Sequence, residues 1–402
     1  MKIIEGGVCA AKGFKAGAMR CGIRKSHTKK DLAMILSECV CNASAVYTTN
    51  RVKASPILLT KEHLADGKAQ AVIVNSGNAN ACAPFGMENA RRQAKAGARA
   101  LGVSEENVIV ASTGVIGQTL PVEAIEAHAG EMEMKYDNSL VAAEAIMTTD
   151  TKVKTIAVEF DIDGTTCHIG GICKGSGMIH PNMGTMLCFI TTDCAVSSEM
   201  IRKALLFNVK RTFNRVTVDG DTSTNDMCTV LANGMAGNAE ITAEGPAYEA
   251  FCEALQAVMQ DLARKIAADG EGASKLMTCT VKGAKDEETA EVLAKSIAGS
   301  SLTKAAMFGS DANWGRVLCA MGYSGAAFNT EKVLVEFASK EGSIAVCEDG
   351  RGLDFDEDLA KKILSQDEVE INVTLQEGSG SATCWGCDLT YDYVKINGDY
   401  RT

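Results

Sequence analysis

The sequence predicts a layered α/β protein rather than a purely doubly wound sheet. Strand-like and helix-like stretches alternate along the 402 residues, with no repeat, low-complexity tract or Pro/Ser-rich linker between them. Residues 153–172 have the pattern of a hairpin, which a purely parallel sheet would lack. Hydrophobic residues make up 46% of the chain, which suits a well-buried core in about two domains or one large unit.

The elements of the first half can be placed in chain order. Residues 69–74 form an apolar run typical of a buried strand, and the polar segment 75–80 after it is expected to be a turn. Residues 86–101 are rich in alanine and predict a helix. Residues 107–110 predict a second short strand, which is expected to end in the Gly-containing loop 112–117.

The hairpin and the second half follow the same reasoning. Residues 153–160 alternate apolar and polar side chains, residues 161–164 predict the turn, and a return strand is expected after it. Residues 333–337 and 369–373 predict two more strands. A long helix is predicted by apolar residues at helical spacing, namely Phe251, Leu255, Val258, Met259, Leu262 and Ile266.

The charge balance, the lengths of the apolar runs and the first residues argue against several classes of protein. Lys and Arg number 40 and Asp and Glu 51, so 40 − 51 gives a net charge of −11, which argues against a nucleic-acid-binding protein. No apolar run approaches the ~18 residues of a membrane span. Residues 1–7 lack the basic-then-apolar pattern of a signal peptide, so we expect a cytoplasmic protein.

The cysteines and histidines predict neither a disulfide scaffold nor a metal site. The 16 cysteines lie mostly in apolar segments, where a thiol behaves as a small hydrophobic group in a reducing compartment. The C-x-x-C pair Cys384 and Cys387 has no second pair and no nearby histidine, as a zinc site would require. The five histidines form no H-E-x-x-H motif.

Two familiar loop motifs are absent. Lys174-Gly175-Ser176-Gly177 has the letters of a nucleotide-binding loop in the wrong order, because a P-loop needs G-x-x-x-x-G-K-[ST]. No G-x-S-x-G sequence occurs, which excludes the serine of an α/β-hydrolase.

The segment 174–193 is the most unusual part of the chain. A loop rich in Gly and Pro runs directly into a continuous apolar strand, and Thr185 lies at the junction. N-terminal-nucleophile enzymes use such a Gly-Thr bond: the hydroxyl attacks the preceding carbonyl, the resulting ester hydrolyses, and the new α-amine serves as the base. Gly184 would tolerate the twisted backbone that this attack needs. From the residues alone, an ordinary junction between a loop and a strand remains the alternative.

Several motifs together resemble the ornithine acetyltransferase (glutamate N-acetyltransferase) family. The resemblance spans essentially the whole chain, and its longest motifs are residues 174–193 and 214–226. Gly184 departs from the family pattern, which usually has Ala before the nucleophile. The remaining matching segments are residues 48–50, 75–82, 112–117, 148–151, 313–316 and 391–402.

The resemblance assigns roles to individual residues. It implies that the chain cuts itself between Gly184 and Thr185, and that Thr185 then accepts an acetyl group. Thr113 and Gly114 resemble the oxyanion hole, one through its hydroxyl and one through its backbone N–H. His180 is interpreted as a structural loop residue. Together with Thr185, the residues that resemble substrate-holding positions are Thr148, Lys174, Glu271, Asn397 and Thr402.

The resemblance also implies a function and an architecture. Acetyl would pass from N2-acetylornithine to glutamate by a ping-pong mechanism without a cofactor, with acetyl-CoA as a second donor in a bifunctional member. The implied fold is a sandwich of stacked mixed sheets flanked by helices, superficially like N-terminal-nucleophile hydrolases. Residues 1–184 would form an α chain and residues 185–402 a β chain, assembled as α₂β₂. The alternatives are an aminopeptidase or amidase of related fold and a non-catalytic amino-acid-binding protein.

Overall fold

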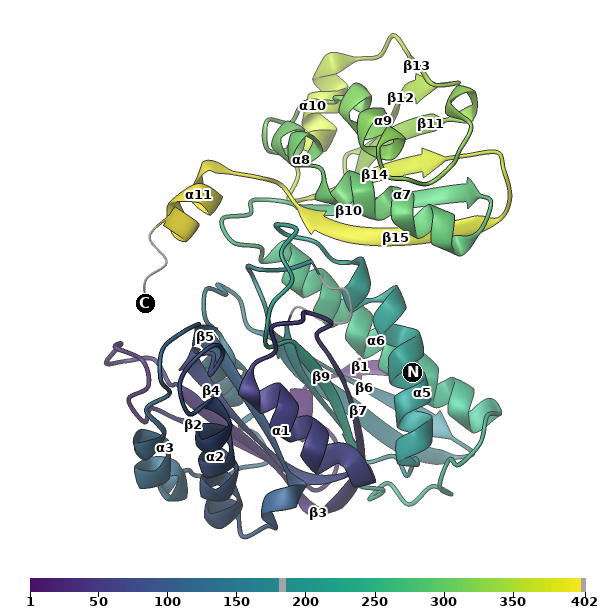
Figure 1. Ribbon diagram of the computed structural model, residues 1–402. Coiled ribbons are helices and arrows are strands. Elements are labelled where there is room, and N and C mark those ends of the chain that lie inside the picture. The colour runs from purple at the N-terminus through teal and green to yellow at the C-terminus, as the bar shows by residue number, and fades with distance from the viewer. Residues whose placement is uncertain (181–185, 399–402) are drawn as a thin grey trace.

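The computed structural model describes residues 1–180 and 186–398, and its strands form a nine-stranded and a six-stranded sheet (Figure 1). Gly184, Thr185 and Thr402 therefore lie outside the described residues. The nine-stranded sheet contains β1 (Lys2–Ile4), β2 (Phe14–Met19), β3 (Leu32–Tyr47), β4 (Lys68–Asn78), β5 (Val108–Val115), β6 (Lys154–Ile162), β7 (Thr165–Lys174), β8 (Leu187–Thr192) and β9 (Met227–Ala232). The six-stranded sheet contains β10 (Leu276–Ala284), β11 (Leu334–Ser339), β12 (Gly342–Glu348), β13 (Arg351–Gly352), β14 (Glu368–Thr374) and β15 (Gly380–Cys387).

Helices cover both sheets. The first half of the chain contains α1 (Ser55–His63), α2 (Gly86–Leu101), α3 (Val122–His128) and α4 (Ser139–Ile146). The second half contains α5 (Ser198–Arg211), α6 (Pro246–Ala268), α7 (Glu287–Gly299), α8 (Ser301–Phe308), α9 (Trp314–Gly322), α10 (Glu357–Leu364) and α11 (Tyr391–Gly398). Among these, no helix is both long enough and apolar enough to cross a membrane.

The long strand β3 joins two parts of the nine-stranded sheet. Its first half pairs with β2 and β4, its second half pairs with β9, and the register with β4 shifts between Leu36 and Cys41. One part therefore runs through β2, β3, β4 and β5, and the other through β9, β8, β7, β6 and β1. The pairs β4–β5 and β8–β9 are parallel and the others are antiparallel, so the sheet is mixed.

Alternating side chains give each part of this sheet two buried faces. Phe189 of β8 shares one core with Val72 of β4, which belongs to the other part of the sheet. Ile190, the next residue along β8, shares a different core with Leu262 of α6. Neighbouring residues of a strand point to opposite faces, so the second part lies between the first part and the helices α5 and α6.

The outer face of the first part is covered by α2 and α3. Ala90, Ala94 and Ala98 recur at every fourth residue of α2 and pack in one core with Ile73 of β4. The small alanine side chains let the helix approach the sheet closely. The order of layers is therefore helices, sheet, sheet, helices, which confirms the predicted sandwich of stacked mixed sheets flanked by helices.

The six-stranded sheet forms a second lobe, drawn in green and yellow in Figure 1. Its strand order is β13-β12-β11-β14-β10-β15, and α7, α8, α9 and α10 pack on one face. Helix α6 links the lobes, because Leu276 of β10 and Trp385 of β15 belong to the same core as its residues Val258 and Leu262. The predicted helix with this apolar spacing and the two predicted strands of this half are confirmed as α6, β11 and β14.

One local prediction was wrong. Residues 75–78 and 112–115 were expected to be a turn and a loop, yet they continue β4 and β5. Their polar side chains have buried partners, since the Ser112 hydroxyl donates to Asn75 Oδ1 on the neighbouring strand at 2.6 Å and the Ser76 hydroxyl donates to the Ala145 carbonyl of α4 at 2.5 Å. A buried polar residue that finds such a partner can remain in a strand.

Candidate active site

A cavity of about 350 Å³ brings together six of the residues singled out by sequence. They come from five places in the chain: the end of β5, the loop after α4, the end of β7, the loop after α6, and α11. The cavity is lined by Thr113, Gly114, Thr148, Lys174, Glu271 and Asn397, together with Ala79, Val115, Ile116, Thr149, Gly177, Met178, Ser223, Thr224 and Asn225.

Thr113 and Gly114 are held at the end of β5 by its parallel pairing with β4. Gly114 lies opposite Gly77 and has φ 131°, which side chains other than glycine rarely adopt. A Cβ at Gly114 would lie 2.3 Å from the Gly77 carbonyl carbon, so this close approach requires glycine. The Asn225 side-chain amide also binds this strand, because it donates a hydrogen bond to the Ser112 carbonyl at 2.8 Å.

Lys174 and Thr148 meet around the buried carboxylate of Asp150. The Thr148 N–H donates to Asp150 Oδ2 at 3.0 Å, and the Gly175 N–H donates to Oδ1 at 2.7 Å. The Lys174 ammonium lies 3.9 Å from Asp150 Oδ2. Burial acts to raise the pKa of Asp150, but the charges of Lys174 and Lys154 outweigh it and lower that pKa, so the carboxylate stays ionised.

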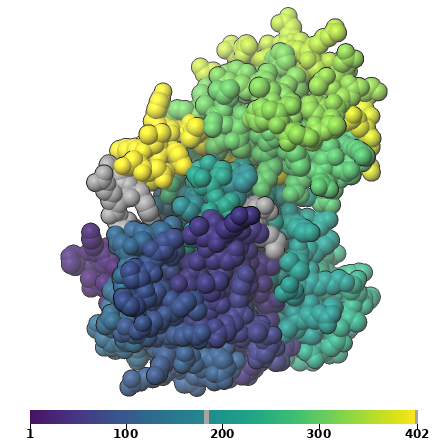
Figure 2. Space-filling model, viewed as in Figure 1, coloured from purple at the N-terminus to yellow at the C-terminus, as the bar shows by residue number. Residues whose placement is uncertain are grey.

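Glu271 and Asn397 connect the C-terminal helix to the cavity. The Glu271 N–H donates to the Ser176 carbonyl at 2.9 Å, and the Asn397 amide donates to Glu271 Oε2 at 2.8 Å. The Thr390 hydroxyl, just before α11, donates to the Gly272 carbonyl at 2.6 Å. Figure 2 shows α11, in yellow, reaching from the upper lobe toward the lower one. The described part of the C-terminal segment is thus bonded to the candidate site.

The chain next to the predicted cleavage point lies beside this cavity. Met186 is buried, and Leu187, which begins β8, pairs with Lys174 on one side and Met227 on the other. Strand pairing therefore places the residues directly after Thr185 between the end of β7 and the start of β9.

Asp226, just before β9, was not singled out individually by sequence. It is fully buried, and its Oδ2 atom has no hydrogen-bond partner among the described residues. Burial raises the pKa of Asp226 well above its usual value, although Ser223, Lys174, Thr48 and the Met186 N–H each act to lower it. Burial thus favours the protonated form of the Asp226 side chain more than in an exposed aspartate.

His180 is not among the residues that line the described cavity. Its Nδ1 atom is 2.9 Å from the Thr217 hydroxyl, and its carbonyl accepts a hydrogen bond from Thr222 at 2.8 Å. Burial and the charge of Lys295 lower its pKa to about 4, although Asp219 acts in the opposite direction. These contacts connect the loop before the predicted cleavage point to residues 217–222.

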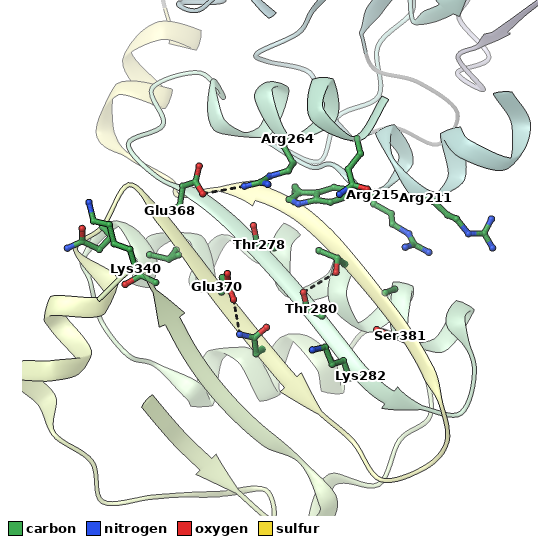
Figure 3. A pocket seen from close by; sticks show the side chains of 18 of the residues that line it. Arg211, Arg215, Arg264, Thr278, Thr280, Lys282, Lys340, Glu368, Glu370 and Ser381 are labelled. Atoms are coloured by element: carbon green, nitrogen blue, oxygen red, sulfur yellow. Dashed lines mark hydrogen bonds and ion pairs between the residues drawn. The ribbon is translucent and has the colours of Figure 1, made fainter. Parts of the chain in front are cut away.

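A larger cavity of about 830 Å³ lies elsewhere, on the polar face of the six-stranded sheet. Figure 3 shows Thr278, Thr280 and Lys282 of β10 pointing into it. Several of its charges are already paired, as Arg264 is with Glu368 at 3.3 Å. None of the predicted site residues in the described part of the chain lines this cavity, so it is not the candidate active site.

The sequence also did not single out Asp150, Lys154 and Asp269. Asp150 lies in the segment 148–151, which matches the family. Its partner Lys154, and Asp269 on the other side of that lysine, lie outside every matching motif. Lys154 and Asp269 are 115 positions apart, so their pairing leaves no local pattern in the sequence.

Comparison with known proteins gives a consistent picture. The ArgJ family model matches residues 15–402. The arginine biosynthesis bifunctional protein ArgJ of Caldanaerobacter subterraneus is 49% identical over 405 residues, covering 100% of both chains. The ArgJ protein of Thermotoga neapolitana is 48% identical, covering 97% of this chain and 99% of its own.

A solved structure matches part of the chain. The crystal structure of the arginine biosynthesis bifunctional protein from Bacillus halodurans has 46% sequence identity and a TM-score of 0.51, and it covers 54% of this chain and 100% of its own. The family matches almost the full length and the relatives are similar from end to end. The predicted resemblance is therefore confirmed, and the chain belongs to the ArgJ family of arginine-biosynthesis enzymes.

Proposed function

We propose that this enzyme transfers an acetyl group from N2-acetylornithine to glutamate, with Thr185 as the acetyl carrier after cleavage at Gly184-Thr185. The observation that carries the proposal is one cavity of about 350 Å³ that brings together Thr113, Gly114, a lysine and a glutamate, close to the strand β8 that begins two residues after Thr185. The ArgJ membership and the relatives named for arginine biosynthesis support it.

The reaction consists of two half-reactions at one site. The Thr185 hydroxyl attacks the acetyl carbon of N2-acetylornithine, its proton passes through the α-amine of Thr185 to the departing nitrogen, and the C–N bond breaks to release ornithine. The glutamate amine then attacks the acetyl ester and regenerates the Thr185 hydroxyl. Thr113 and Gly114 would donate hydrogen bonds to the tetrahedral oxygen in both steps.

The charged side chains of the cavity fit the two substrates. Both substrates carry an α-carboxylate, which the Lys174 ammonium would bind with help from the Thr148 hydroxyl. Glu271 would bind the δ-ammonium of ornithine or accept from the free amine, and Asn397 fixes its carboxylate by the 2.8 Å hydrogen bond. Thr402 would contribute from the end of the chain.

Division of the chain at Gly184 is supported by a match in length. Residues 185–402 number 402 − 184 = 218, which is 54% of 402 residues. The solved chain from Bacillus halodurans aligns over its whole length with 54% of this chain. Cleavage into an α chain of residues 1–184 and a β chain of residues 185–402 would account for this coincidence. We propose that two of each chain assemble as α₂β₂.

Acetyl-CoA would be a second acetyl donor, and the word bifunctional in the names of the relatives supports that extension. The transfer from N2-acetylornithine itself uses no cofactor. The sixteen cysteines are all free thiols in the structure, which supports a reducing, cytoplasmic setting.

Incubation of the purified enzyme with N2-acetylornithine, with and without glutamate, tests the proposal. We expect sustained ornithine release only with glutamate, and no more than one ornithine per site without it. Rapid release without glutamate would instead identify an amidase, because water would then accept the acetyl group. An intact chain of 42.3 kDa without either reaction would indicate a non-catalytic binding protein.

Lys174→Ala is expected to raise the KM for N2-acetylornithine while the chain still folds. The lysine faces a cavity and not the apolar core, and losing a charge-assisted contact costs about 1.5–3 kcal/mol. Steady-state kinetics and thermal unfolding check this. An unchanged KM would contradict the binding role, and a loss of cleavage would assign Lys174 to chain processing.

Gly177→Ala is expected to raise the KM for N2-acetylornithine by displacing Glu271. A Cβ at Gly177 would lie 2.3 Å from the Glu271 carboxylate, whose movement would break the contact with Asn397. Gly130→Ala is the matched control, because nothing lies within 4 Å of the added Cβ there. Equal KM values for the two variants would contradict the role of Glu271.

A further inference from the structure

A buried ion cluster lies at the first residue of β6, next to the loops that line the candidate cavity. The side chain of Lys154 is 1% exposed, and those of Asp150 and Asp269 are 0% and 3% exposed. The Lys154 ammonium lies 2.7 Å from Asp150 Oδ1, pairs with Asp269 Oδ2, and donates to a backbone carbonyl at 3.3 Å. All three of its N–H donors are therefore satisfied away from water.

The two carboxylates of this cluster hold the segments that carry the substrate-binding residues. Asp150 accepts from the backbone N–H groups of Thr148 and Gly175. Asp269 accepts from the Thr151 N–H at 3.1 Å, and its own carbonyl accepts from the Ser176 hydroxyl at 2.6 Å. The cluster thus connects the loop after α4, the end of β7 and the loop after α6.

Asp150 is shared unequally between two lysines. Its Oδ1 atom lies 2.7 Å from the Lys154 ammonium, whereas its Oδ2 atom lies 3.9 Å from the Lys174 ammonium. Burial acts to lower the pKa of Lys154, but Asp150 and Asp269 outweigh it and raise that pKa, so Lys154 keeps its charge. The Lys174 side chain is 11% exposed and lines the cavity. The closer lysine, Lys154, is thus the more deeply buried of the two.

We propose that Lys154 is a positioning residue that occupies Asp150 and thereby leaves the Lys174 ammonium available to the substrate carboxylate. This inference rests on the proposed acetyl transfer. Without Lys154, Lys174 becomes the remaining lysine beside Asp150, and the substrate carboxylate must compete with a buried carboxylate for it. A carboxylate already in place is a strong competitor, because neither partner of a buried pair is stabilised by water.

Lys154→Met is expected to raise the KM for N2-acetylornithine by about tenfold, the scale of coupling between neighbouring charges, with a much smaller change in kcat. N-acetyl-1,4-diaminobutane, which is the same donor without its α-carboxylate, separates this effect from a general loss of activity. Its kcat/KM is expected to stay close to the wild-type value, so that the preference for the carboxylate-bearing donor falls. An undiminished preference would overturn the inference.

Two double variants distinguish positioning from simple charge balance. Lys154→Met with Asp150→Asn and Lys154→Met with Asp269→Asn both remove one positive and one negative charge from the cluster. The first removes the competitor for Lys174 and is expected to have the lower KM of the two, whereas the second retains Asp150 and is expected to keep the high KM. Equal KM values in the two double variants would overturn the inference, even if Lys154→Met alone failed to fold.

Lys152→Met is the matched control. Lys152 lies two residues before Lys154 and its side chain is exposed, so the KM of this variant is expected to equal that of the wild type. Thermal unfolding of every variant accompanies the kinetics. Different results would refute the two proposals. A wild-type enzyme that transfers no acetyl group would refute the proposed function. An active wild-type enzyme whose two double variants have equal KM values would refute only the role of Lys154.

Discussion

Thr185→Ala is expected to give one uncleaved chain without transferase activity. No hydroxyl would remain to attack the Gly184 carbonyl, and neither the acetyl acceptor nor the free α-amine that activates it would form. Denaturing gels and intact masses report the chain length, and an assay with N2-acetylornithine and glutamate reports the transfer. An active or cleaved Thr185→Ala protein would contradict the mechanism.

Two conservative variants serve as controls for that experiment. Thr185→Ser keeps the hydroxyl and is expected to cleave and transfer, although more slowly without the β-methyl group that restricts χ1. Gly184→Ala introduces the commoner family residue and is expected to cleave at a comparable or higher rate. Failure of both controls would indicate that the substitutions disturb folding rather than the chemistry.

Thr113→Val is expected to lower kcat by about 10²–10³-fold with a small change in KM. Valine has nearly the shape of threonine but cannot donate a hydrogen bond to the tetrahedral oxygen, and the loss of one oxyanion donor typically has an effect of this size. Steady-state kinetics for both substrates measure it. A drop in kcat of less than about threefold would remove Thr113 from the oxyanion hole.

Thr148→Val is the matched comparison for Thr113→Val, since it removes a hydroxyl from the same cavity. We assign Thr148 to substrate binding, so its KM is expected to rise more than its kcat falls. Identical kinetic profiles for the two variants would contradict the separate roles of these residues.

The sequence predicts most of the fold because local patterns reflect packing. The alanine spacing of residues 86–101 corresponds to α2 along its full length, since small residues at every fourth position form the face that meets the sheet. The polar ends of β4 and β5 were not predicted, because Asn75 and Ser76 usually mark turns and here have buried partners that are distant in sequence. The length predicted about two domains or one large unit, but it did not predict where the two lobes divide, because α6 packs against both and no linker separates them.

The sequence predicts only those residues of the candidate site that lie in recognisable motifs. Family motifs carry Thr113 and Lys174, and the fold brings these distant positions to one cavity. The cluster of Lys154 and Asp269 left no motif, because its members are 115 positions apart and charged residues are ordinarily exposed. Only the folded chain shows that their charges are buried together.

Mass spectrometry of the purified protein after incubation with N2-acetylornithine alone tests the central claim most directly. We expect two chains, one ending at Gly184 and one beginning at Thr185, and one acetyl group on Thr185 that disappears when glutamate is added. A protein that remains a single chain and yet transfers acetyl, or one that transfers acetyl without modification of Thr185, would contradict the account.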